Sequence, residues 1–109
     1  MNSTEIQVLR DISKNPCISQ REIASRNGVS LGKVNYVIRS LVDKGHVKVR
    51  NFRNSENKNG YMYLLTPNGV VAKARLTVEY LRRKMDEYEK LRWELDELKQ
   101  ELSRPGETS

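Results

Sequence analysis

The chain has 109 residues and a formal net charge of +6, which suits one small domain and favours a polyanionic partner such as nucleic acid. One cysteine excludes an internal disulfide, and with a single histidine it leaves no Cys/His zinc cluster. No apolar run approaches the roughly 18 residues of a membrane helix and no signal-peptide pattern opens the chain, so we expect a cytoplasmic protein.

The first predicted element is a packing helix. Ser3 or Thr4 can cap it, and Pro16 prevents its continuation beyond Asn15. Its apolar residues recur at spacings of three, as the buried stripe of a helix does: Ile6, Leu9 and Ile12.

Residues 19–44 predict two short helices joined by a tight turn. Ser19 and Glu22 form a capping-box pattern, Gly28 suits the left-handed turn that ends the first helix, and Ser30 can cap the second. The second helix carries an apolar stripe of Leu31, Val34, Ile38, Leu41 and Val42. This order is that of a helix-turn-helix, whose second helix enters the major groove of DNA.

A β-hairpin is predicted directly after the second helix of the helix-turn-helix. Residues 46–50 alternate polar and apolar side chains, residues 53–60 form a polar loop, and residues 61–65 return as a second strand.

A long helix completes the chain. Thr66 and Pro67 provide an N-cap and a first helical position, and no further proline occurs until Pro105, so one helix of roughly 37 residues could extend about 55 Å. Leucines near its end follow the 4-3-4 spacing of a coiled-coil seam. We expect dimerisation through Leu81, Tyr88, Leu91, Leu95, Leu98 and Leu102.

Three regions result from this interpretation. Residues 1–66 form a DNA-binding domain, residues 67–103 a dimerisation helix, and residues 104–109 a disordered tail. The first region holds eleven Lys and Arg against five Asp and Glu, whereas residues 67–109 hold nine of each. All the net positive charge therefore lies on the segment with the helix-turn-helix.

Polar side chains of the second motif helix are the candidates for DNA contact. Arg39 and Lys33 can bind guanine edges or phosphates, and Asn35 can bind adenine. Gly32 disfavours a helix by roughly 1 kcal/mol relative to Ala, which close approach to a DNA backbone would explain. An ordinary solvated face, or a merely weak first turn, is the alternative. The predicted set is Ser30, Gly32, Lys33, Asn35, Tyr36, Arg39 and Ser40.

The hairpin supplies a second basic cluster. Arg50, Arg53, Asn54 and Lys58 could follow the DNA backbone with an arginine in the minor groove, or they could form a solubilising loop. Tyr61 and Tyr63 could donate hydroxyls to phosphate, but alternating aromatic residues in a strand more often pack.

No residues suggest catalysis. Cys17 lacks a neighbouring histidine that would activate it as a peroxide sensor, so we expect it to be a small buried residue, and His46 is best interpreted as the start of a strand. Acidic and basic residues alternate along the last helix as they do on solvated coiled-coil flanks. We predict that the protein is not an enzyme and needs no cofactor or metal.

Residues 4–76 resemble the MarR-type winged helix-turn-helix regulators. The matching segments are residues 19–24 (Ser-Gln-Arg-Glu-Ile-Ala), 41–47 (Leu-Val-Asp-Lys-Gly-His-Val) and 65–69 (Leu-Thr-Pro-Asn-Gly). Residues 30–36 and 51–55 further resemble the exopolysaccharide-associated subgroup. The family's wing usually has Asp-x-Arg-Asp where this chain has Asn51-Phe52-Arg53-Asn54, so the resemblance implies a minor-groove role for Arg53 without its acidic partner.

The combined prediction is a mainly α fold with a small β-hairpin (α+β), a winged helix-turn-helix followed by one long coiled-coil helix. As a homodimer it would bind a pseudo-palindromic operator in double-stranded DNA and regulate transcription. The resemblance adds control of exopolysaccharide genes, and no small-molecule effector is identified. The alternative is a winged-helix module that binds another protein without reading DNA sequence.

Overall fold

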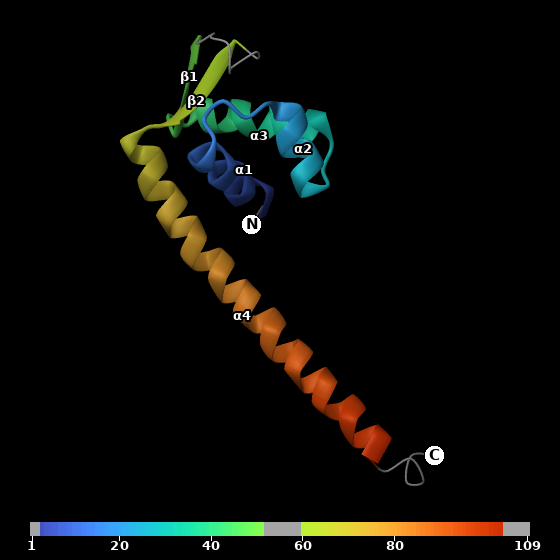
Figure 1. Ribbon diagram of the computed structural model, residues 1–109. Coiled ribbons are helices and arrows are strands. Elements are labelled where there is room, and N and C mark those ends of the chain that lie inside the picture. The colour runs from blue at the N-terminus through green and yellow to red at the C-terminus, as the bar shows by residue number, and fades with distance from the viewer. Residues whose placement is uncertain (1–2, 52–59, 104–109) are drawn as a thin grey trace. The chain divides into compact units, whose positions relative to one another are not determined.

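The computed structural model describes residues 3–51 and 60–103. Four helices and one hairpin follow each other as α1 (Ser3–Lys14), α2 (Gln20–Asn27), α3 (Leu31–Asp43), β1 (Val47–Asn51), β2 (Tyr61–Leu65) and α4 (Pro67–Ser103) (Figure 1). The chain divides into two compact units, Met1–Thr77 and Val78–Ser109, and the boundary lies inside α4. The predicted mainly α fold with a small hairpin is confirmed, whereas the predicted tail of residues 104–109 lies outside the described residues.

The core of the first unit forms where α1 and α3 bury their apolar stripes. Ile6, Leu9 and Ile12 are buried as predicted, and Val8 joins them. These β-branched and leucine side chains pack with the buried residues of α3, which are Val34, Val37, Ile38 and Leu41.

Two core predictions for α3 were wrong. Leu31 and Val42 are 42% and 38% exposed, while Val37, which was not predicted, is buried. At 3.6 residues per turn, Leu31 and Val42 lie within about 20° of each other at one edge of the stripe. Val37 lies between Val34 and Leu41 in the i, i+3, i+7 pattern, so it faces the core.

A buried carboxylate on α1 holds the last turn of α2. Asp11 accepts a 2.8 Å hydrogen bond from Asn27 Nδ2 and lies 3.5 Å from Arg26 Nε. Asn27 Nδ2 also donates to the Ile23 carbonyl at 2.8 Å. This link fixes α2 on α1 just before the turn that leads into α3.

Helices α2 and α3 begin at the predicted caps. Ser19 Oγ accepts from the Glu22 amide at 3.0 Å, and Ser30 Oγ accepts from the Lys33 amide at 3.1 Å. Gly28 has φ +65°, the left-handed conformation predicted for it, because a residue without Cβ adopts it at little cost.

The hairpin is antiparallel, with Val47 opposite Leu65 and Asn51 opposite Tyr61. The second strand matches the predicted residues, and the first begins one residue later than predicted. The Tyr63 amide donates a 2.8 Å hydrogen bond to the Pro16 carbonyl, so the hairpin is attached to the segment between α1 and α2.

The start of α4 is joined to the end of α3. Thr66 Oγ1 accepts from the Gly69 amide at 3.0 Å, as predicted for an N-cap, and donates to the Gly45 carbonyl at 2.5 Å. A Cβ at Gly69 would overlap the His46 carbonyl group, so the two backbones meet closely there. Ala72 and Leu76 are buried, and α4 has 37 residues, as the sequence predicts.

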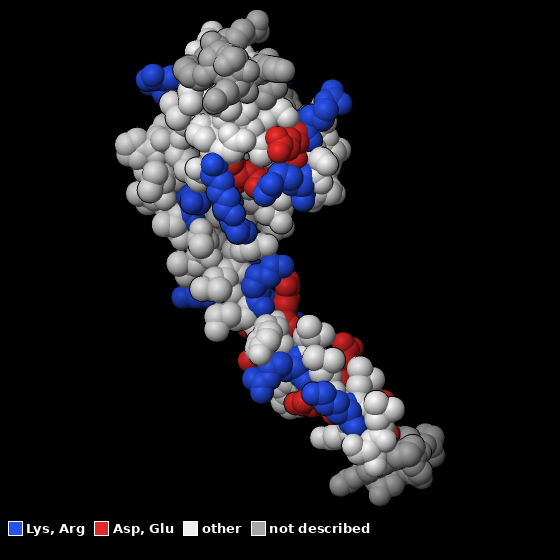
Figure 2. Space-filling model, viewed as in Figure 1, with Lys and Arg blue, Asp and Glu red and all other residues white. Residues whose placement is uncertain are grey.

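The second unit is a helix with an exposed apolar face. Leu81, Tyr88, Leu91, Leu95, Leu98 and Leu102 are all at least 45% exposed. Both basic and acidic side chains are distributed along this part of α4 (Figure 2).

Candidate nucleic-acid interface

The polar face of α3 lies opposite its buried stripe. Six of the seven residues predicted to contact DNA are exposed, and Ser40 is half-buried. Tyr36 is 72% exposed, more than Leu31 and Val42, the other exposed large hydrophobic residues of this helix. The exposed six, which present hydroxyl, ammonium, amide and guanidinium groups together with one open backbone position, are Ser30, Gly32, Lys33, Asn35, Tyr36 and Arg39.

Gly32 is not required by the packing of the protein itself. A Cβ built on Gly32 meets no heavy atom within 4 Å among the residues that the structure describes. Its backbone is therefore open to solvent in the first turn of α3, where amide groups and the helix dipole favour an anion. This geometry is compatible with close approach of a phosphate backbone.

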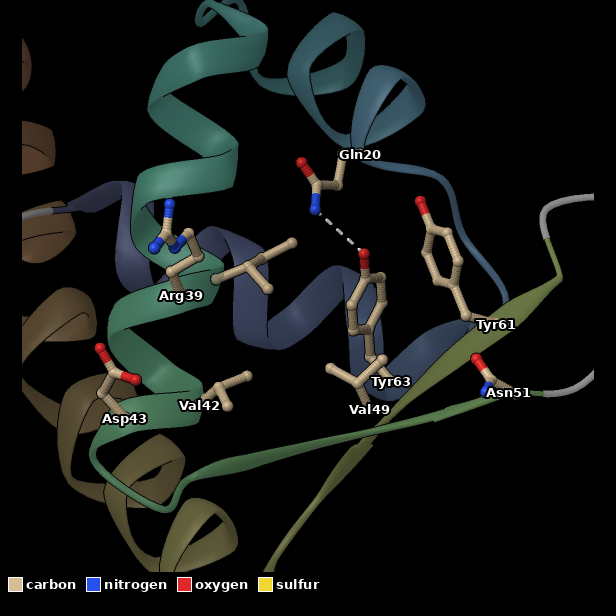
Figure 3. A pocket seen from close by; sticks show the side chains of 9 residues that line it. Gln20, Arg39, Val42, Asp43, Val49, Asn51, Tyr61 and Tyr63 are labelled. Carbon is tan, nitrogen blue, oxygen red and sulfur yellow. Dashed lines mark hydrogen bonds between the residues drawn. The ribbon is translucent and has the colours of Figure 1, made fainter.

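Asn35 is held by a chain of hydrogen bonds from two other elements. Its Nδ2 donates to Gln20 Oε1 at 3.2 Å. Gln20 Nε2 in turn donates to the Tyr63 hydroxyl at 3.1 Å (Figure 3). Gln20 is the first residue of α2, and Tyr63 lies in the middle of β2. The amide predicted to contact adenine is thus positioned by α2 and the hairpin together.

Tyr63 anchors this chain from the core. Its side chain is 3% exposed, and burial raises the pKa of its hydroxyl to about 12, with the Gln20 hydrogen bond acting in the opposite direction. Tyr61 meets it in an edge-to-face contact with ring centroids 5.2 Å apart. For Tyr63 the packing interpretation is confirmed, because its hydroxyl is already engaged inside the protein.

Gln20 was missed by the sequence analysis. A polar residue just after the Ser19 cap is compatible with any solvated first turn, so its identity alone carries no signal. Its contacts with Asn35 and Tyr63 depend on residues 15 and 43 positions away in the sequence.

A hollow of about 430 Å³ lies between α3 and the hairpin. We call it the helix–hairpin hollow. Arg39 and Asp43 border it from α3, and Asn51 and Tyr61 border it from the strands (Figure 3). Its apolar lining comes mainly from Ile38, Val42, Val49 and Tyr63.

The β1–β2 hairpin is the wing of this fold, and the structure describes only one of the four wing residues predicted to contact DNA. Arg50 and Lys48 are both exposed on β1. The predicted contacts of Arg53, Asn54 and Lys58 lie outside the described residues.

Other candidate sites are limited. Cys17 is half-buried, so the prediction of a buried residue was wrong; it lies on the link between α1 and α2, where its amide donates to Asn15 Oδ1 at 3.1 Å. Within residues 3–51 and 60–103, His, Cys, Asp and Glu do not gather in any group of three that could hold a metal ion. The helices in the same ranges include none with the length and hydropathy to cross a bilayer.

The helix order, the capped turn and the hairpin define a winged helix-turn-helix fold. Residues 1–48 match the family model described as winged helix-turn-helix DNA-binding. An uncharacterized protein of Methanocaldococcus jannaschii is 48% identical over 50 residues, which is 45% of this chain and 19% of that protein. The chain thus spans about a fifth of the length of this curated relative.

Solved structures of transcription regulators share the fold. The PcaV regulator of Streptomyces coelicolor, solved with its natural ligand, is 21% identical with a TM-score of 0.69, covering 96% of this chain and 73% of PcaV. BldR of Sulfolobus solfataricus is 24% identical with a TM-score of 0.63, covering 95% of this chain and 75% of BldR. Wild-type MarR of E. coli is 24% identical with a TM-score of 0.58, covering 90% of this chain and 78% of MarR.

Proposed function

We propose that the protein is a transcription regulator that binds double-stranded DNA in the cytoplasm and places α3 in the major groove. The observation that carries the proposal is the exposed polar face of α3 in a fold whose first 48 residues match a DNA-binding family. The net positive charge of residues 1–66 favours the same partner, because phosphate neutralisation supplies most of non-specific affinity.

Each side chain has a role in this proposal. Arg39 and Lys33 contact guanine edges or phosphates, and Asn35 contacts adenine. Ser30 can donate its hydroxyl to a phosphate while its oxygen caps α3. The wing residues that would contact the backbone and the adjacent minor groove are the basic Arg50, Arg53 and Lys58 together with the amide Asn54.

Two copies would act together through α4. The exposed leucines of the second unit supply the contact surface, and a two-fold symmetric dimer would match a pseudo-palindromic operator. Control of exopolysaccharide genes is the narrowest form of the proposal and rests on the sequence resemblance of residues 30–36 and 51–55 alone.

Sequence-specific DNA binding can be tested by selecting bound sequences from random duplex DNA with the purified protein. The affinities of variants for the selected site are then measured by titration. Arg39→Ala should weaken binding to the selected site by about 1–3 kcal/mol and relax preference at one position per half-site. Arg10→Ala removes the same charge from an exposed position of α1 and is the matched control, with a small effect that is equal on all duplexes. Equal losses for Arg39→Ala on selected and scrambled duplexes would exclude base reading by this residue.

A substitution at Lys58 in the hairpin distinguishes contact with phosphate from contact with bases. Lys58→Ala, if it meets only phosphate, should weaken binding to all sequences alike and reduce the salt slope by about one unit. A slope that is unchanged in this variant would remove Lys58 from the interface.

The second candidate function is a winged-helix module that binds another protein. The helix–hairpin hollow favours it, because Val42 and Val49 are 38% and 46% exposed on the face proposed to meet DNA. Undiminished DNA binding in Arg39→Ala and Lys58→Ala, or no salt-dependent DNA affinity in the unmodified protein, would select this candidate.

A separate experiment tests dimerisation through the exposed leucines at the end of α4. Leu95→Asp with Leu98→Asp should give monomers in sedimentation equilibrium, because charged groups cannot be buried there without a partner. Trp93→Asp with Gln100→Asp adds the same charge to exposed positions outside the seam and should leave the dimer intact. A dimer that survives the leucine substitutions would exclude this seam.

A further inference from the structure

The end of α4 carries a regular heptad pattern. Tyr88, Leu95 and Leu102 are spaced by seven and occupy position a, whereas Leu91 and Leu98 occupy position d. All five side chains are at least 45% exposed, so this stripe is uncovered within the described chain. Apolar a and d positions of this kind are buried when a second helix packs on them.

The residues beside this stripe divide by charge. Position g, just before each a, is acidic throughout, with Glu87, Glu94 and Glu101. Position e, just after each d, is basic throughout, with Arg92 and Lys99. One edge of the stripe is therefore negative and the other positive.

This division distinguishes the two ways of pairing two copies. In a parallel, in-register pair, each g residue faces the e residue five positions later on the partner. Glu87 then meets Arg92 and Glu94 meets Lys99, and both contacts occur twice. In an antiparallel pair, g faces g and e faces e, so each edge meets its own charge.

The charged groups are accessible for such pairing. Within one chain, Glu87 Oε2 lies 3.2 Å from Lys84 Nζ and Arg92 Nη1 lies 3.8 Å from Glu89 Oε1. All four side chains are more than half exposed, so these ion pairs within the helix are weak and can rearrange.

From these positions we infer that residues 87–102 of two copies form a parallel, in-register, two-stranded coiled coil. The inference rests on the proposed homodimer and specifies its geometry. Both chains enter such a coiled coil from the same end, so the two DNA-binding units precede the same end of the dimer. That arrangement matches two half-sites on one duplex.

Disulfide trapping tests the orientation in the full chain with Cys17→Ser as background. In a parallel dimer, Leu102→Cys faces its own copy and should form a covalent homodimer in a glutathione redox buffer. In an antiparallel dimer an a residue faces a d residue, so residue 102 faces residue 84 when Leu91 pairs with Leu95, or residue 91 when Leu95 pairs with Leu98. A mixture of Leu102→Cys chains with tagged Lys84→Cys or Leu91→Cys chains should then give the mixed product. Predominance of the mixed product would overturn the parallel orientation.

Charge exchange provides an independent measurement. Glu94→Lys places two repulsive pairs against Lys99 in a parallel dimer and should weaken dimerisation by about tenfold, as should Lys99→Glu. The combined variant restores both pairs and should regain the original dissociation constant. Failure of the combined variant to recover would contradict the g-to-e pairing.

Sedimentation equilibrium separates this inference from the proposed function. A monomer at all concentrations would overturn the coiled coil, while DNA binding by that monomer would preserve the proposed DNA contact. A dimer that gives the mixed disulfide would overturn only the orientation. Circular dichroism of each variant verifies that the helices remain folded.

Discussion

Gly69 gives the sharpest test of how the winged helix-turn-helix is assembled. This residue is buried in the first turn of α4, and an added Cβ would overlap the His46 carbonyl oxygen and lie 2.9 Å from its carbon. Both atoms belong to backbone, which cannot rotate away as a flexible side chain can. Gly69→Ala should therefore separate the start of α4 from the loop after α3.

Two opposing effects determine how much Gly69→Ala changes the free energy of unfolding. Ala is favoured over Gly in a helix by about 0.5–1 kcal/mol, whereas overpacking a closed site costs about 1–3 kcal/mol or more. Because the neighbour is backbone, the upper part of that range applies, and Gly69→Ala should lower the free energy of unfolding by about 1–2 kcal/mol.

Gly32→Ala is the matched control in the first turn of another helix. Its Cβ meets no described atom within 4 Å, so it should raise the free energy of unfolding by up to about 1 kcal/mol. Urea unfolding followed by circular dichroism measures both variants. Equal stabilities would refute the close contact at Gly69, because the helix-propensity term is common to the two substitutions.

Three further predictions concern Tyr63, Thr66 and Gly28. Tyr63 has its pKa raised from 10.0 to about 12, so the unfolded chain loses this proton first and stability should fall as pH rises from 10 to 12. Tyr63→Phe should lack this part of the alkaline fall and cost about 0.5–1.5 kcal/mol at neutral pH, as urea titrations at several pH values would show. Thr66→Val removes the cap of α4 and should cost about 0.5–2 kcal/mol in the same assay, whereas a neutral effect would deny the cap a role. Gly28→Ala places a side chain at φ +65° and should cost about 1 kcal/mol, and an unchanged unfolding midpoint would contradict that strain.

The sequence alone determined the local structure of this protein. Caps at Ser19, Ser30 and Thr66 were predicted because a hydroxyl bonds an amide two or three residues away, which requires no knowledge of the fold. The end of α2 at Gly28 was predicted from the left-handed conformation that glycine adopts readily, and the length of α4 from the absence of proline before Pro105. The polar face of α3 was also predictable from its helical spacing.

Tertiary structure decided which edge of each stripe is buried. Leu31 and Val42 satisfy the same helical pattern as Val37, and the packing of α1, α2 and β1 against α3 buries Val37 while leaving the first two exposed. Periodicity identifies an apolar side of a helix, but it does not give the width or centre of the neighbouring surface.

The contacts that position the candidate site were likewise set by the fold. Gln20, Asn35 and Tyr63 come from three elements and meet through hydrogen bonds whose formation requires correct packing of all three. Gly69 has no local feature that demands glycine, since its helix would tolerate Ala until the His46 backbone approaches. Short-range hydrogen bonding is encoded residue by residue, whereas long-range contacts exist only after the chain has brought distant segments within a few ångströms.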